Sequence, residues 1–251
     1  ISKIINEIKD EYKIIPIINS KRQIVDLLTK KNKHISDYRD NYKLKNICTV
    51  IMAGGEGTRL HPFTKILPKP LVPINGKAMV EHIISRFKKY GVNKFFLSLN
   101  YKSNLIKAYF SDNKLYNLKF INERKPLGTA GSLKKMSNKT KKSFFVVNCD
   151  TIINCDYISL YDFHNTKKFD LTIVASKKNH SIPYGVCQLD MRGKLKILKE
   201  KPTQSFLANT GFYIINPKIL KYIKKNEKLD MNNLIDRLVR KKLKVGVFPN
   251  R

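Results

Sequence analysis

Apolar and polar positions follow a regular pattern from residue 48 onward. Residues 48–53 form an apolar run that leads into a glycine-rich loop, which predicts a strand buried on both faces. In residues 79–87 the apolar positions recur every three or four residues, which predicts a helix that ends near Gly91. This region therefore begins with a predicted strand that is followed by a predicted helix.

The same alternation continues to the end of the chain. Further strands are predicted over residues 95–99, 118–122, 144–147, 171–176, 184–189, 195–199, 212–215 and 243–248, and further helices over 130–136, 158–166, 218–223 and 232–240. Because strands and helices alternate at this spacing, the connections are expected to be right-handed crossovers in a mostly parallel sheet covered on both faces. The predicted fold class is α/β, doubly wound and Rossmann-like, with ligands bound beyond the carboxyl ends of the strands.

Residues 1–45 have a different pattern. Residues 1–12 have helical spacing, residues 14–19 and 23–28 predict two short strands around a turn, and residues 30–45 predict a polar linker. So few elements cannot form a stable core alone. The pattern resembles the end of a CBS motif, a regulatory module that usually works in pairs, and implies an adenine nucleotide at this part of the intact protein. We therefore expect a partial CBS motif with its linker over residues 1–45 and a second domain over 46–251.

Composition narrows the class of protein. No apolar run in the 251 residues approaches the roughly 20 residues of a membrane span. The formal charge of +31 would suit a polyanion-binding protein, but Arg fills only nine of the 50 basic positions and the lysines are scattered in doublets, which favours compositional bias. We expect neither a nucleic-acid partner nor a membrane partner. The four cysteines have no metal-site spacing, which favours buried thiols in a reducing cytoplasm.

The most informative segment is the glycine-rich loop Ala53-Gly-Gly-Glu-Gly-Thr-Arg-Leu60. Its three glycines would let backbone N–H groups approach an anion closely. Arg59 adds a forked donor, and Lys69, between two prolines, adds a point charge, which together suit a triphosphate. The loop lacks the Walker A and Rossmann spacings. It could also be an ordinary turn, but a turn does not explain Arg59 or the prolines around Lys69.

Residues 54–62 and 68–73 (Pro-Lys-Pro-Leu-Val-Pro) resemble the signature of the sugar-1-phosphate nucleotidyltransferases. The resemblance covers residues 46–251 and implies a GT-A-like form of the predicted fold. It also implies the reaction of a nucleoside triphosphate with a sugar 1-phosphate to give a nucleotide sugar and pyrophosphate. It makes Arg59 and Lys69 catalytic residues that neutralise the phosphates. The residues that it implies for nucleotide phosphate binding are Ala53, Gly54, Gly55, Gly57 and Thr58.

A second motif, Glu123-Arg-Lys-Pro-Leu-Gly-Thr-Ala-Gly131, follows a predicted strand. The resemblance places the backbone of Gly128 against the nucleobase and Glu123 at the base-reading position. Guanine presents N1–H and its N2 amino group side by side, and these two donors match one carboxylate, so GTP is favoured. The alternatives are a Pro-Gly turn that starts a helix and a surface pair between Glu123 and a nearby lysine.

Asp150 comes directly after another predicted strand. An Asp in that place could simply cap a helix. The resemblance makes Asp150 a catalytic residue and the ligand of Mg²⁺, which takes few carboxylates and fills its shell with phosphate oxygens and water. A second metal carboxylate usually follows the last strand in this family. Because the chain begins without Met and ends at Arg251, we expect a trimmed chain with that ligand beyond Arg251, or else an incomplete site.

Three further matches to the family imply a site for the sugar phosphate. Gly185 would offer its backbone to sugar hydroxyls, although a β-bulge is the alternative. Glu200 would accept from a hydroxyl and Lys201 would hold the phosphate, although the two could be a solvated charge pair. Asn209 would donate its amide to the sugar, although Asn and Gly are also turn residues.

The sequence therefore predicts a cytoplasmic, Mg²⁺-dependent guanylyltransferase that could form a homo-oligomer. It most resembles CBS-linked enzymes that use an amino-sugar 1-phosphate such as glucosamine 1-phosphate for bacterial surface glycans or nonulosonic acids. Mannose-1-phosphate guanylyltransferase is the enzyme alternative. A regulatory module that senses nucleotides without turnover is the alternative from another class. A nucleic-acid binder is a third, which the scattered lysines argue against.

Overall fold

The computed structural model describes residues 14–18, 22, 24–29, 44–111 and 117–250. The chain divides into two compact units, Ile1–Asn41 and Tyr42–Arg251, and each is described by itself. In the first unit, β1 (Ile14–Ile18) and β2 (Ile24–Thr29) pair in antiparallel fashion, which confirms the two short strands. The helix expected over residues 1–12 and most of the expected linker lie outside the described residues. The CBS fragment and its boundary at residue 45 stay predictions.

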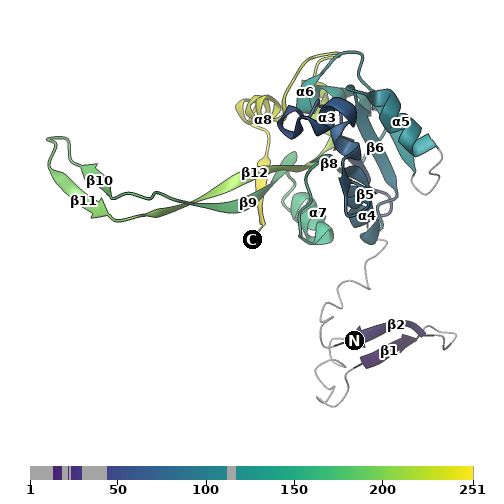
Figure 1. The fold of residues 1–251 in the computed structure, drawn as a ribbon, viewed down its shortest axis with the longest axis horizontal. Helices are drawn as coiled ribbons and strands as arrows, with labels where there is room; N and C mark the ends of the chain where they lie inside the picture. Colours follow the sequence, from purple (N-terminus) through teal and green to yellow (C-terminus); the bar gives the residue numbers. More distant parts are fainter. Residues whose placement is uncertain (1–13, 19–21, 23, 30–43, 112–116, 251) are drawn as a thin grey trace. The chain divides into compact units, whose positions relative to one another are not determined.

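A seven-stranded sheet with the order β13-β9-β12-β8-β3-β6-β7 forms the centre of the second unit (Figure 1). All of its pairs are parallel except those that β12 makes with β8 and β9. The mostly parallel sheet predicted from the sequence is therefore confirmed, with one reversed strand. The strands are β3 (Cys48–Met52), β6 (Lys94–Leu99), β7 (Leu118–Asn122), β8 (Phe144–Asn148), β9 (Leu171–Ser181), β12 (Thr203–Ile215) and β13 (Val245–Asn250).

Helices cover both faces of this sheet, because alternate residues of its buried strands point to opposite sides. Ile51 of β3 packs in one apolar cluster and its neighbours Val50 and Met52 pack in the other. The first cluster includes side chains of α4 (Met79–Lys89), α5 (Ser103–Ser111) and α7 (Tyr157–Thr166). The second includes side chains of α6 (Gly128–Gly131), η3 (Ser132–Met136), η4 (Pro217–Tyr222) and α8 (Met231–Arg240). The doubly wound arrangement is thus confirmed.

The helices differ from the predictions in several places. The helix predicted over residues 130–136 is a short α6 that continues as the 3-10 helix η3, and the helix predicted over 218–223 is the 3-10 helix η4. Helix α5 was not predicted at all. It buries Ile106 and Phe110, but Leu105 and Tyr109 stay exposed, so its apolar residues do not mark a single face.

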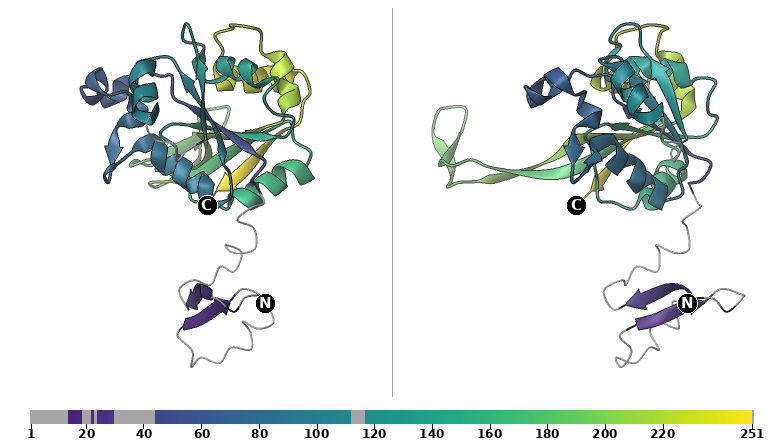
Figure 2. Two further views of the ribbon diagram at one scale, coloured as in Figure 1. Left: turned by 90° about the vertical axis from the view of Figure 1, so that its right-hand side faces the viewer. Right: turned by 45° about the vertical axis from the view of Figure 1, so that its right-hand side comes forward.

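Strands β9 and β12 continue beyond the sheet as a two-stranded ribbon (Figures 1 and 2). We name this ribbon the arm: residues 177–208, with the hairpin of β10 (Val186–Leu189) and β11 (Leu195–Lys199) at its tip. Within the sheet β9 and β12 are buried, whereas along the arm nearly every side chain is exposed. The predicted strands over 171–176 and 212–215 match only the buried parts.

Two short strands, β4 (Pro73–Ile74) and β5 (Lys77–Ala78), pair with each other before α4. Over the described ranges, no helix combines the length and the apolar character that crossing a lipid bilayer requires.

Candidate active site

A pocket of about 370 Å³ opens at the carboxyl ends of β3, β7 and β8. From β3 the chain first moves to β6 and β7 on one side and later returns to β8 on the other, so the pocket lies where the strand order reverses. Ligands of doubly wound sheets bind at such a point, and the volume is within the usual range of ligand pockets. Nine predicted residues line it: Gly54, Gly55, Gly57, Thr58, Arg59, Lys69, Glu123, Gly128 and Asp150.

The glycine-rich loop is held in place by the chain that follows it. Thr64, fully buried in α3 (Phe63–Ile66), donates its hydroxyl to the carbonyl oxygen of Gly57 at 2.9 Å. A Cβ atom added to Gly57 would lie 3.0 Å from Cβ of Lys69, so the loop packs directly on the segment that carries this lysine. Arg59 lies in η1 (Thr58–Leu60) and Lys69 begins η2 (Lys69–Leu71). Both predicted cations are thus positioned by short 3-10 turns.

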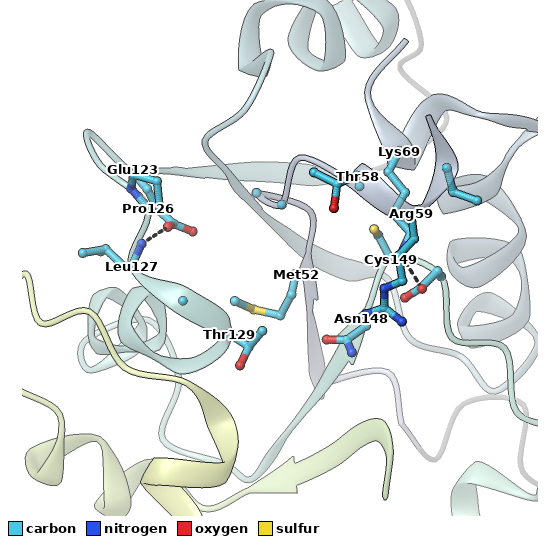
Figure 3. A pocket seen from close by; sticks show the side chains of 16 residues that line it. Met52, Thr58, Arg59, Lys69, Glu123, Pro126, Leu127, Thr129, Asn148 and Cys149 are labelled. Carbon is cyan, nitrogen blue, oxygen red and sulfur yellow. Dashed lines mark hydrogen bonds and ion pairs between the residues drawn. The ribbon is translucent and has the colours of Figure 1, made fainter. Parts of the chain in front are cut away.

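Lys69 and Asp150 form an ion pair with 2.5 Å between Nζ and Oδ2 (Figure 3). Their side chains are 23% and 41% exposed, so both remain accessible from the pocket. In water-accessible surroundings such a pair is weak, and a polyphosphate can compete for the ammonium group. The pocket therefore holds a cation and a carboxylate that are paired to each other before a ligand binds.

Two residues that the sequence analysis missed lie at the same end of the pocket. Figure 3 shows Arg59, Lys69, Asn148 and Cys149 together there. Asn148 could have been found, because it directly follows the predicted strand over 144–147 at the carboxyl end of the sheet, where ligands are expected. Burial raises the pKa of the Cys149 thiol to about 12, so this thiol is protonated at neutral pH and is no nucleophile.

Glu123, Pro126 and Leu127 lie at the opposite end of the pocket (Figure 3). Oε1 of Glu123 accepts from the hydroxyl of Ser98 at 2.7 Å, and Oε2 accepts from the backbone N–H of Leu127 at 2.9 Å. The carboxylate is therefore held by these groups and, among the described residues, not by a surface pair with a nearby lysine. A carboxylate offers about four lone pairs, so two remain for a ligand.

Among the five residues predicted to bind the nucleotide phosphates, Ala53 is the one that does not line the pocket. Its side chain is 1% exposed, and its N–H donates to the carbonyl oxygen of Ser98 at 2.9 Å. The side chain and the N–H of Ala53 therefore point into the protein interior and not into the pocket.

The predicted sugar-phosphate residues fall into two places. Asn209 lines a smaller cavity of about 350 Å³ that shares Asp150 with the main pocket, and its amide donates to the Tyr213 hydroxyl at 2.9 Å. Gly185 and Glu200 lie together near the tip of the arm, where a Cβ atom on Gly185 would be 3.1 Å from Oε2 of Glu200. Lys201 follows at the same point. The structure brings none of these three arm residues into either cavity.

The donor set around Asp150 limits how a metal could bind. Within the described part of the chain, no three His, Cys, Asp or Glu side chains gather in a way that could hold a metal ion. Mg²⁺ is commonly held by one or two carboxylates together with substrate phosphates and water. Asp150 alone thus fits an Mg²⁺ ion that binds together with a nucleotide, and does not fit a metal site made only of protein groups.

A doubly wound sheet that carries a glycine-rich loop, two cations and a carboxylate at its switch point defines a nucleotide-binding α/β protein. Residues 48–249 match the Nucleotidyl transferase family, and the chain belongs to this family. The predicted resemblance is thereby confirmed.

Two curated relatives named mannose-1-phosphate guanyltransferase, from Debaryomyces hansenii and Saccharomyces cerevisiae, are each 37% identical to this chain over 186 residues. The matches cover 69% of this chain and 51% of each relative, so the chain spans about half the length of these proteins. A crystal structure of HddC from Yersinia pseudotuberculosis complexed with GMP-PN is similar, with a TM-score of 0.62 and 27% identity over 81% of this chain and 90% of that chain.

Proposed function

We propose that the chain carries the nucleotidyl-transfer part of a sugar-1-phosphate guanylyltransferase. One observation carries this proposal: a single pocket joins Arg59, Lys69 and Asp150 at one end to Glu123 at the other. A nucleoside triphosphate needs the same combination, because its charged and base-specific parts lie at opposite ends. Family membership supports the reaction class.

The reaction is an in-line displacement at phosphorus. An oxygen of the sugar 1-phosphate attacks the α-phosphorus of the triphosphate, and the bond from that phosphorus to the bridging oxygen breaks. The electron pair of that bond leaves with pyrophosphate, and no protein nucleophile is needed. Such transfers depend on positioning and charge neutralisation. Arg59 and Lys69 would neutralise the phosphates, and Lys69 would exchange its contact with Asp150 for a phosphate oxygen.

Asp150 would hold Mg²⁺ once Lys69 has moved to the phosphates. The ion, when bound, supplies Lewis-acid polarisation of phosphate oxygens. Asp150 would keep a cationic partner in this exchange, because it would gain the divalent ion as it loses the ammonium group.

Guanine is the base that the free lone pairs of Glu123 suit best. One lone pair remains on each carboxylate oxygen after the bonds to Ser98 and Leu127, and N1–H and the N2 amino group of guanine are two adjacent donors. Ser98 and Leu127 would fix the carboxylate in place before the base binds. The names of the curated relatives and the GMP-PN bound to HddC also favour a guanine nucleotide.

Mannose 1-phosphate is the first sugar substrate to test, because the curated relatives are named for it. Glucosamine 1-phosphate remains the alternative that the CBS resemblance implies. In both cases Gly185, Glu200, Lys201 and Asn209 would bind the sugar phosphate. We also propose a cytoplasmic enzyme that binds an adenine nucleotide at its CBS part and can form a homo-oligomer.

The test is pyrophosphate release by the full chain with Mg²⁺, each of the four NTPs and a panel of sugar 1-phosphates. We expect turnover with GTP and one hexose 1-phosphate, and none when the sugar phosphate is left out. Absence of turnover with every pair would refute the proposal that the chain is an enzyme. GTP binding without turnover would support the nucleotide-sensing alternative, and a preference for UTP would refute the role of Glu123.

A further inference from the structure

The loop that forms the base end of the pocket is held by a distant segment of the chain. Residues 127–131 contain α6, and residues 229–231 lead into α8, about one hundred positions later. The N–H groups of Ala130 and Gly131 both donate to the carbonyl oxygen of Leu229, at 2.9 and 3.1 Å. The N–H of Leu229 donates in return to the carbonyl oxygen of Leu127 at 2.9 Å. These backbone bonds tie the two segments together.

The two helices also exchange their caps. Asp230 has the extended backbone of an N-cap residue, but its side chain makes no cap bond to its own helix α8. Its Oδ1 instead accepts from the N–H of Thr129 at 3.1 Å, in α6. The hydroxyl oxygen of Thr129 accepts from the N–H of Met231, the first residue of α8, at 2.8 Å. Each side chain thus satisfies an N–H that the start of the other helix leaves free.

This contact explains why Gly128 is a glycine. Gly128 has a φ of +72°, and a Cβ atom there would lie 2.6 Å from Oδ1 of Asp230 and 2.7 Å from the carbonyl oxygen of Leu229. The glycine is therefore required by the approach of the loop to Asp230. The N–H groups of Thr129, Ala130 and Gly131 are used in the same contact. Phosphate binding at the start of α6 is thereby disfavoured, which leaves this end of the pocket for the base.

The bonds between residues 127–131 and residues 229–231 also affect the position of the Glu123 carboxylate. Leu127, Gly128 and Thr129 line the pocket, whereas Asp230 does not. The N–H of Leu127 holds Oε2 of Glu123, so a shift of the loop moves that carboxylate as well. Glu227, which pairs with Arg237 of α8 at 2.6 Å, further fixes the segment before Asp230. A short bonded path thus runs from Asp230 through Thr129 and Leu127 to Glu123.

We infer that Asp230 is a positioning residue for nucleotide binding, which acts through its exchanged cap with Thr129. The inference rests on the proposed function for the identity of the nucleotide. It concerns affinity for the nucleotide and not the chemical step, because the path from Asp230 ends at Glu123, at the base end of the pocket.

The test compares four single variants of the full chain, Asp230→Ala, Asp230→Asn, Thr129→Val and Asp156→Ala, and the double variant Asp230→Ala/Thr129→Val. Asn keeps the acceptor oxygen, and Val removes the Thr129 hydroxyl at similar volume. Asp156 is the matched control, because it caps α7 by accepting from the N–H groups of Ile158 and Ser159, away from the pocket. For each variant we would measure the Kd for GTP, the KM for GTP and for the sugar phosphate, kcat, and Tm.

We expect Asp230→Ala and Thr129→Val to raise the Kd and KM for GTP about three- to tenfold, the size of one lost hydrogen bond. The kcat and the KM for the sugar phosphate should change less than about twofold, and Asp230→Asn should restore most of the GTP affinity. The double variant should cost less than the product of the single effects, because the two lost hydrogen bonds belong to the same exchanged cap and the loss of either one loosens the same loop. Asp156→Ala should lower Tm with no change in GTP affinity.

An unchanged GTP affinity in Asp230→Ala, with a Tm loss like that of Asp156→Ala, would show a purely structural role and overturn the inference. If Asp230→Ala does not fold, the same result in Thr129→Val would overturn it. Failure of the unsubstituted chain to turn over any substrate pair would refute the proposed enzyme alone, because the GTP Kd still tests Asp230. A chain that binds no nucleotide at all would refute both.

Discussion

The nucleotide side and the sugar side of the candidate site are built on different parts of the second unit. On the nucleotide side, fully buried polar side chains hold the pocket in place: Thr64 bonds the glycine-rich loop and Ser98 bonds Glu123. On the sugar side, Glu200 and Lys201 lie on the arm, where nearly every side chain is exposed. One side is fixed by packing and the other has no core beneath it.

The boundary between the two sides is a bulge in β12. The register with β9 shifts between Asn209 and Phe212, where the strand leaves the sheet. Asn209 and Asp150 line one cavity at this point, so the predicted sugar residue that lies outside the arm adjoins the predicted metal ligand. The nucleotide side is therefore pre-organised, whereas sugar binding depends on where the arm lies. Loss of a group on the nucleotide side should therefore reduce catalysis more than loss of a group on the sugar side.

The largest effect is expected for Asp150→Asn. Loss of the carboxylate removes the Mg²⁺ ligand and the partner of Lys69, and removal of such charge stabilisation costs about a thousandfold in kcat. The rate of pyrophosphate release at saturating substrates measures it. Asp236→Asn on the exposed surface of α8 is the control, with kcat expected within about twofold. A loss in Asp150→Asn below about tenfold would mean that this residue is not the metal ligand.

The next effect concerns the other end of the nucleotide side. We expect Glu123→Gln to reduce kcat/KM for GTP about 30-fold and to narrow the preference over the other NTPs, because an amide cannot accept from both guanine donors. Ser98→Ala, which leaves the carboxylate in place but removes one of its supports, should cost less. Equal losses for all four NTPs would indicate that Glu123 only supports the loop.

A smaller effect, confined to the other substrate, is expected on the arm. Lys201→Ala should raise the KM for the sugar 1-phosphate about tenfold, since one charged contact to phosphate is lost, and should leave the KM for GTP unchanged. Lys196→Ala is a matched control, because it removes an exposed lysine of β11 in the same arm. If both variants behave alike, Lys201 has no place in the sugar site and the comparison of the two sides fails.

Much of the buried fold could be predicted from the sequence, because burial leaves a periodic trace in the residues. The runs at β3 and β8 and the helical spacing of α4 and α8 are such traces. The hairpin at the tip of the arm leaves such a trace, because strands are predicted over 184–189 and 195–199. The ribbon between the tip and the sheet leaves none: residues 177–181 of β9 are polar and exposed, and their pairing with β12 is made by the backbone. The antiparallel direction of β12 also has no sequence signal, because a buried run is apolar in either direction.

In the candidate site, the residues could be predicted from the sequence but their contacts could not. Arg59, Lys69, Glu123 and Asp150 could be named because each stands in a motif or at the end of a predicted strand. The contacts between them could not, because they join residues far apart in sequence. Lys69 and Asp150 are 81 positions apart, and the contact of Asp230 with Thr129 spans 101. Only the three-dimensional fold shows these pairs.

The smallest effect is expected for the stability of the arm itself. Leu198→Ala removes a side chain that is 60% exposed, so we expect the free energy of unfolding to change by less than about 0.5 kcal/mol. Leu97→Ala is the reference, because Leu97 of β6 is fully buried and its loss should cost about 2–5 kcal/mol. Denaturant unfolding of both variants measures this. A cost above about 1 kcal/mol for Leu198→Ala would show that the arm is covered in solution. The sugar side would then be packed as the nucleotide side is, and Lys201→Ala should cost more than tenfold.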